Sequence, residues 1–200
     1  LKVEDADEII VLMSAATNYV QCMDDSYNYF SQEDPLEKVQ AMLHKVADKK
    51  YTALLATHQK DYHSLYDRMR LNLGNLPEAP VAPTDSLLKG MDENTNSEQE
   101  NQYLEMLYFQ FGRYLLISST RVGLLPPNLQ GLWCNTINTP WNGDYHLNIN
   151  LQMNHWPAEV ANLSELHLPL VEWTKQQVAS GERTAKAYYN APVSYTHLRA

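Results

Sequence analysis

Residues 97–120 read "SEQENQYLEMLYFQFGRYLLISST", and this stretch decides the fold class. Its first turn carries acidic residues, which interact favourably with the positive end of a helix dipole. From Leu104 onward, apolar residues occur nearly all round the helix, which is the pattern of a helix buried on several sides. The stretch therefore predicts a long helix within a helical core.

Further helices are predicted on both sides of this one. The segment 34–50, "DPLEKVQAMLHKVADKK", has Asp34 as N-cap and Pro35 at the first helical position. A second helix is predicted over residues 51–69 from apolar residues at helical spacing. Asn162, with Glu165 three residues later, has the form of a capping box at the start of another helix. The chain is therefore predicted to be mainly α.

Two other segments are predicted to differ from this pattern. Residues 7–19, "DEIIVLMSAATNY", are a continuous run of apolar and small residues that predicts a buried strand, with a helix as the alternative. Residues 74–97 are rich in proline, asparagine and aspartate, which predicts a surface connection or linker. We place a domain boundary near this connection.

Composition and charge narrow the possible partners. Of the 200 residues, 44% are apolar, which is enough for a sizeable core. The formal charge of −9 argues against nucleic acid or an anionic membrane as partner. No signal peptide is visible, and no apolar run approaches the roughly 20 residues of a membrane span. Two distant cysteines, no metal-ligand spacing and no phosphate-binding loop predict neither a metal nor a cofactor.

A long loop over residues 126–145 contains Trp133 and Trp141. Loops of this length in a compact domain tend to be functional or disordered, and two tryptophans argue against disorder. Aromatic rings can stack on the C–H face of a sugar, while neighbouring neutral amides bind its hydroxyls. The alternative is that both tryptophans fill the core beneath a structural loop.

The loop leads into residues 144–159, "DYHLNINLQMNHWPAE", where polar and apolar residues alternate. If this segment is extended, His146, Asn148 and Asn150 point to one side. Buried amides in such a row must find hydrogen-bonding partners, which a sugar or the neighbouring backbone could supply. Asp144 and Glu159 flank the row, but nothing marks them as the carboxylate pair of an ordinary glycoside hydrolase.

Four blocks of the sequence resemble one enzyme family, in the same order. They are "HQKDYHSLYDRMRLNLG", "FGRYLLISSTR", "LPPNLQGLW" and "DYHLNINLQMNHWPAEVANLSEL". These blocks look like those of the glycoside hydrolase family 95 α-L-fucosidases, and the similarity runs over residues 6–189. The resemblance therefore implies a hydrolase that acts on fucosylated glycans.

The resemblance also implies a large multi-domain protein, of which this chain would be a fragment. Residues 1–30 would hold the last strands of an N-terminal β-sandwich-like domain. Residues 31–96 would form a helical linker and connection, and residues 97–192 the first part of a catalytic (α/α)6 barrel. Residues 193–200, "VSYTHLRA", look like translated adapter sequence, and we exclude them as a non-native tail.

In the family, the motif His-x-Asn-x-Asn lies in the sugar site, and it matches His146, Asn148 and Asn150 in this chain. The resemblance implies that Asn148 and Asn150 hold the attacking water and that His146 contacts the sugar. The reaction implied is release of terminal L-fucose, typically α-1,2-linked, with inversion at the anomeric carbon. The general acid and the carboxylate partner of the Asn pair would lie outside this chain, so the fragment alone is expected to be inactive.

Four further residues are candidates for the wall of the sugar pocket: Asn128, Gln130, Trp133 and Trp141. Two alternatives stay open: an α-L-galactosidase on the same scaffold, and a non-catalytic carbohydrate-binding or structural helical module. The glycan-degrading role of the family implies a periplasmic or secreted protein.

Overall fold

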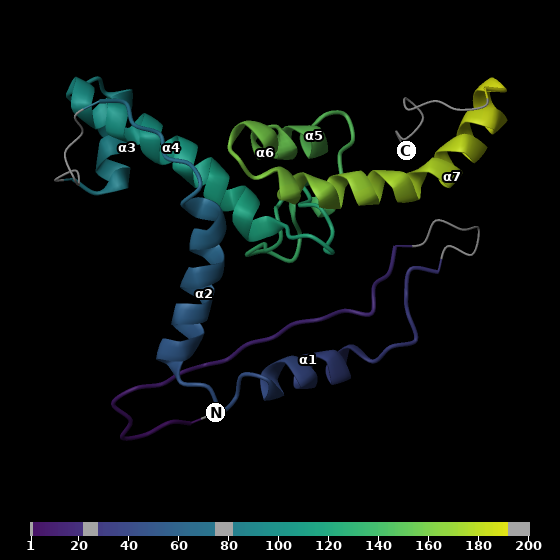
Figure 1. The fold of residues 1–200 in the computed structure, drawn as a ribbon, viewed down its shortest axis with the longest axis horizontal. Helices are drawn as coiled ribbons and strands as arrows, with labels where there is room; N and C mark the ends of the chain where they lie inside the picture. Colours follow the sequence, from purple (N-terminus) through teal and green to yellow (C-terminus); the bar gives the residue numbers. More distant parts are fainter. Residues whose placement is uncertain (1, 22–27, 75–81, 192–200) are drawn as a thin grey trace. The chain divides into compact units, whose positions relative to one another are not determined.

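The structure is a computed structural model, and it describes residues 2–21, 28–74 and 82–191 (Figure 1). The helices are α1 (Pro35–His44), α2 (Tyr51–Tyr66), α3 (Thr84–Asp92), α4 (Glu98–Ser119), α5 (Asn150–His155), α6 (Pro157–Val160) and α7 (Leu168–Tyr189), with 3-10 turns η1 (Pro140–Gly143) and η2 (Ser164–His167). The prediction of a mainly α chain is confirmed. Two compact units, Leu1–Tyr62 and His63–Ala200, are described separately below.

In the first unit, the prediction of a buried strand over residues 7–19 is wrong. Val11 and Met13 are 79% and 80% exposed, and no regular structure covers residues 8–18. The one β-type pairing among the described residues of this unit is an antiparallel bridge between Tyr19 and Phe30, where Val20 N donates to Tyr29 O at 2.9 Å. A strand needs a hydrogen-bonded neighbour, and the described residues provide none for the apolar run.

Helix α1 begins as the sequence predicts. The Asp34 carboxylate accepts a hydrogen bond from Leu36 N at 2.8 Å, and Pro35 occupies the first helical position. The helix ends at His44. Helix α2 also begins at the predicted residue, Tyr51, but ends at Tyr66, three residues before the predicted end.

Helix α4 packs against α3 and α6 in the second unit. Ser97 and Glu100 make a capping box: Ser97 Oγ accepts from Glu100 N, and the Glu100 carboxylate accepts from Ser97 N at 2.8 Å. Leu104, Leu116 and Ile117 are buried along the helix. The long buried helix predicted from residues 97–120 is confirmed.

The predicted connection over residues 74–97 contains a helix that the sequence interpretation missed. Helix α3 packs against α4 (Figure 1), and its Leu87 is 1% exposed. Asn96 closes the turn between the two helices, because its side-chain amide donates to Leu87 O at 2.7 Å. This helix has no side-chain N-cap, so the usual signal for a helix start is absent. Residues 75–81 of the predicted connection, like the predicted tail at 193–200, lie outside the described residues.

The alternating row is not extended, so the condition under which His146, Asn148 and Asn150 would all point to one side is not met. Residues 147–149 form a turn, and α5 begins at Asn150. The same sequence places Leu151, His155 and Ala158 at helical spacing, and all three are at most 3% exposed. Burial of this helical stripe outweighs the two-residue alternation, because no described strand pairs with the segment.

The capping box expected from Asn162 and Glu165 does not form. Asn162 lies in the left-handed region with φ 56° just after α6. The Glu165 carboxylate instead forms an ion pair with Arg68 at 2.5 Å, which is a contact across 97 positions of sequence that no local pattern encodes. Helix α7 begins later, at Leu168. No helix of the described residues is both long enough and apolar enough to cross a membrane.

Candidate functional site: the tryptophan loop and the start of helix α5

The loop over residues 126–145 is fixed at both ends to the helical scaffold. Tyr145 Oη donates to Pro126 O at 2.9 Å, which joins the two ends of the loop directly. The Tyr145 ring packs against buried Trp173 of α7 with 5.2 Å between ring centroids. Thr120, at the end of α4, donates through Oγ1 to Leu125 O at 3.0 Å. These contacts therefore hold both ends of the loop against the helices of the second unit.

Asn128 and Gln130 shape the first half of this loop. Asn128 and Gly131 form a tight antiparallel bridge, and Gly131 takes the left-handed φ of 80° that this turn requires. Asn128 Oδ1 accepts from Gln130 N at 2.7 Å, and Gln130 Nε2 donates to Pro140 O at 3.4 Å. Both side chains thus brace the loop with one polar atom each.

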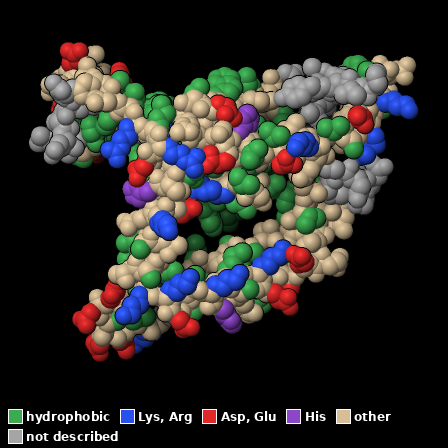
Figure 2. All heavy atoms as spheres, in the orientation of Figure 1, with side chains coloured by type: hydrophobic (Ala, Val, Ile, Leu, Met, Phe, Trp, Pro, Cys, Tyr) green, Lys and Arg blue, Asp and Glu red, His purple; other side chains and the backbone are tan. Residues whose placement is uncertain are grey.

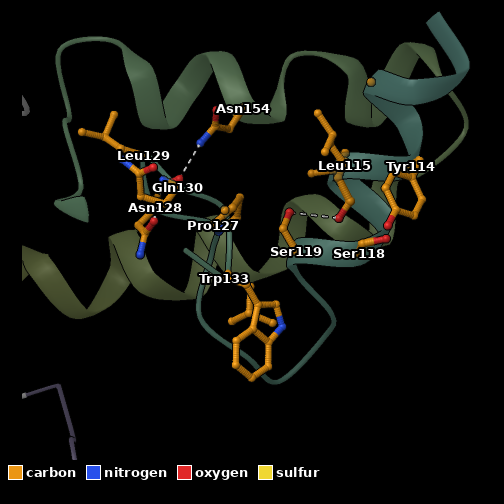
Figure 3. Close-up of a pocket in the computed structure, with 14 residues that line it drawn as sticks. Tyr114, Leu115, Ser118, Ser119, Pro127, Asn128, Leu129, Gln130, Trp133 and Asn154 are labelled. Carbon is orange, nitrogen blue, oxygen red and sulfur yellow. Dashed lines mark hydrogen bonds between the residues drawn. The ribbon is translucent and has the colours of Figure 1, made fainter. Parts of the chain in front are cut away.

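A pocket of about 460 Å³ lies between this turn and the C-terminal half of α4 (Figure 3). Three of the predicted pocket-wall residues line it: Asn128, Gln130 and Trp133. Asn154 of α5 lines it too and donates through Nδ2 to Asn128 O at 3.4 Å, which is the dashed line drawn from Asn154 in Figure 3. Ser118 and Ser119 supply hydroxyl groups from α4. Leucine and proline side chains complete the lining, so the pocket combines an indole, amides and hydroxyls with an apolar wall, a combination that suits a polyhydroxylated ligand with apolar C–H faces.

The remaining predicted residues lie outside this pocket. Trp141 and His146 contact each other edge to face, with 6.3 Å between ring centroids. Asn148 and Asn150 are exposed, and His146 is half-buried. The structure thus divides the seven candidates into two groups: the pocket residues Asn128, Gln130 and Trp133, and the start of α5 with Trp141, His146, Asn148 and Asn150.

Trp141 has an unusual backbone for its type. Its φ is 49° and that of Asn142 is 55°, so two consecutive non-glycine residues lie in the left-handed region. Such conformations cost free energy and cluster at functional sites. Trp141 is 73% exposed. Figure 2 shows that other hydrophobic side chains also lie at the surface of the molecule. The alternative expectation, that both tryptophans fill the core, is wrong for Trp141 and for Trp133, which is 68% exposed.

The segment that carries His146, Asn148 and Asn150 is held by the first turn of α5. Leu151 N donates to His146 O, and Met153 N donates to Ile149 O, both at 3.0 Å. The Leu151 side chain is 2% exposed and anchors the segment in the core. Tertiary contacts therefore present the two asparagine side chains to solvent from a fixed backbone.

Three titratable side chains near this segment have structural partners. Glu159 contacts His167 Nδ1 at 3.1 Å, and that imidazole stacks on buried His155. Burial lowers the pKa of His155, and its Nδ1 bonds to Leu151 O at 2.9 Å. His155 was not a sequence candidate, and only its helical spacing from Leu151 could have indicated its burial. Within residues 2–21, 28–74 and 82–191, no group of three or more His, Cys, Asp or Glu side chains could hold a metal ion.

A helical scaffold that presents exposed indole rings beside neutral amides has the features of a carbohydrate-active protein. Residues 50–200 match the family model described as the glycosyl hydrolase family 95 catalytic domain, and the chain belongs to this family. The match begins within the predicted linker, and the division of the chain into domains stays a prediction.

Three curated relatives agree with this family. The chain is 40% identical over 191 residues to a probable alpha-fucosidase A of Aspergillus niger, covering 93% of this chain and 23% of the relative. It is 36% identical over 185 residues to a probable alpha-fucosidase A of Aspergillus oryzae, covering 92% and 24%. It is also 36% identical over 194 residues to alpha-L-fucosidase 2 of Arabidopsis thaliana, covering 96% and 22%. The chain spans about a quarter of the length of these relatives.

Proposed function

We propose that the full-length protein to which this chain belongs is an inverting α-L-fucosidase that releases terminal α-1,2-linked L-fucose from glycans. One observation carries the proposal: the His146-x-Asn148-x-Asn150 motif lies on an exposed turn and helix start within the part of the chain that matches the family's catalytic domain. All three relatives bear names of alpha-fucosidases, which supports the same activity.

In this proposal, Asn148 and Asn150 hold the attacking water. Both side chains are exposed at the start of α5, as groups that bind a water beside a substrate must be in the absence of that substrate. A neutral amide does not titrate near pH 7, so the pair needs a carboxylate to take up the proton. That carboxylate and the general acid would come from the rest of the full-length protein. An inverting hydrolase needs about 6.5–9.5 Å between its acid and base groups to admit the water.

His146 would contact the fucose ring, together with the Trp141 indole that meets it edge to face. Asn128, Gln130 and Trp133, which line the pocket beside α4, would then form a further wall of the sugar site. Helices α4 to α7 would be the opening helices of an (α/α)6 barrel, preceded by a linker and the end of a β-sandwich-like domain. The location that goes with this function is the periplasm or the exterior of the cell.

The direct test is to express the full-length protein and supply 2′-fucosyllactose, which carries α-1,2-linked fucose. Proton NMR should show β-L-fucose before mutarotation, because inversion converts the α-linkage to the β-anomer. If α-L-fucose appeared first, inversion would be wrong. Faster hydrolysis of an L-galactoside would support the α-L-galactosidase, and no hydrolysis of either would support the non-catalytic module.

The role of the asparagine pair is tested in the same protein with Asn150→Ala and Asn150→Asp. Loss of a water-activating group should lower kcat by about 100-fold or more. Gln176→Ala is the matched control, because Gln176 is an exposed amide on α7 that is not among the candidate site residues. A kcat for Asn150→Ala within about threefold of the control would contradict the assigned role.

A further inference from the structure

The proposed function uses His146, Asn148 and Asn150 of the alternating row, and leaves Gln152 without a role. In the structure, Gln152 Nε2 donates to Leu147 O at 2.6 Å. The side chain is half-buried and points back across the turn formed by residues 147–149. Gln152 therefore does not face solvent beside the two asparagines, as the alternation alone would suggest.

The hydrogen bond from Gln152 is made to the peptide unit that immediately precedes Asn148. The carbonyl of Leu147 lies in the same rigid plane as the N–H of Asn148, so fixing the carbonyl fixes the plane from which Asn148 projects. The N-cap of helix α5 is Ile149, and it forms no side-chain cap. With only six residues, α5 is also too short to order its first turn by helix formation alone.

Three donors from consecutive residues of α5 therefore close the turn. The backbone N–H groups of Leu151 and Met153 bond to His146 O and Ile149 O, and the Gln152 side chain bonds to the carbonyl between them. The two backbone bonds hold the ends of the turn. The side-chain bond holds its middle, at the residue immediately before Asn148.

We propose that Gln152 is a positioning residue for the reaction: its side-chain amide orients the Leu147–Asn148 peptide and so sets the direction of the Asn148 side chain. This inference rests on the proposed function. The inference predicts that loss of the Gln152 hydrogen bond lowers kcat strongly and changes the free energy of unfolding little. One hydrogen bond is a small part of what holds a domain together, whereas a misplacement of about 1 Å in a reacting group can cost about 100-fold in rate.

The test uses two variants of the full-length protein. Gln152→Met keeps the length of the side chain but has no donor, so kcat on 2′-fucosyllactose should fall by about 10- to 100-fold with KM changed by less than about threefold. Gln152→Glu keeps the shape, and its carboxylate repels the Leu147 carbonyl when ionised. When protonated, its O–H can donate as the amide does.

The two variants should therefore differ in their pH profiles. The kcat of Gln152→Glu should recover toward the wild-type value as the pH is lowered from 7 to 5, because the facing carbonyl and partial burial favour the protonated acid. Gln152→Met should show no recovery. Gln176→Glu, at an exposed position of α7, is the charge-matched control and should follow the wild-type profile.

A second measurement separates failure of this inference from failure of the proposed function. Hydrogen exchange at the backbone amides of Leu151 and Met153, which donate to His146 O and Ile149 O across the turn, should be faster in Gln152→Met than in wild type, whether or not the protein hydrolyses a fucoside. If wild type is inactive, the function fails and exchange alone decides the role of Gln152. A kcat within threefold of wild type in an active protein, or unchanged exchange in an inactive one, would overturn the inference.

Discussion

Arg113 provides the sharpest prediction about stability. Its guanidinium is 1% exposed in the interior of the second unit. Nη1 donates to Tyr66 O and Met69 O, each at 2.9 Å, and to Gln110 Oε1 at 2.8 Å, while Nη2 donates to Leu65 O at 3.3 Å. The last carbonyls of a helix have no partner within it, so Arg113 of α4 completes the C-terminal end of α2. The guanidinium also lies 5.2 Å from the centre of the Tyr66 ring.

The perturbation is Arg113→Met, which fills similar space without donors. A hydrogen bond from a charged donor contributes about 1.5–3 kcal/mol, so the three backbone carbonyls represent roughly 4.5–9 kcal/mol before costs. Removing the cation also removes a desolvation penalty of several kcal/mol. We expect a net loss of about 3 kcal/mol. Arg113→Lys should lose most of this as well, because an ammonium group cannot reproduce the planar fork of donors.

Hydrogen exchange measured by mass spectrometry is the assay, because it reports local opening in a protein of several domains. Peptides that cover residues 63–70 and 104–119 should lose about 100-fold in protection in Arg113→Met, since each 1.4 kcal/mol is a factor of about ten. Arg70→Met, at an exposed position, should change protection by less than about threefold. A loss below about fivefold in Arg113→Met would refute the reasoning that its carbonyl contacts hold residues 65–69 to α4.

Three further predictions concern the second unit. Gly90→Ala should lower its stability by about 1–3 kcal/mol in thermal unfolding, because the added Cβ would overlap the Asn96 side chain; an unchanged melting temperature would contradict this packing. Tyr145→Phe removes the hydroxyl that donates to Pro126 O and should cost about 1 kcal/mol, with faster proteolysis inside residues 126–145; unchanged cleavage would show that this bond does not close the loop. Burial lowers the pKa of His155 in the folded protein. In the unfolded chain the imidazole has its ordinary pKa of about 6.5, so below that pH the unfolded chain takes up a proton more readily than the folded one. Stability should therefore decline on acidification, and His155→Phe should flatten that decline in melts recorded from pH 7 to 5; an identical slope would exclude His155 as its source.

The sequence by itself determined the elements whose causes are local. Asp34 followed by proline specified the start of α1, and Ser97 with Glu100 specified the start of α4. In both cases the side chain satisfies backbone N–H groups within three residues, so no distant part of the chain is needed. The motif around His146, Asn148 and Asn150 was likewise visible as a pattern of residue types.

Only the tertiary structure decided how those residues are presented. Alternation over residues 146–154 and helical spacing of Leu151, His155 and Ala158 coexist in one stretch, and the sequence does not rank them. The choice depends on burial: α6, which carries Ala158, packs against α4 and η2, and His155 stacks on His167 of η2. Arg113 shows the same limit, because its carbonyl partners are 44 to 48 positions away. Local hydrogen bonds are encoded by neighbours, whereas the free energy of burial depends on which distant surfaces meet, and that depends on the fold as a whole.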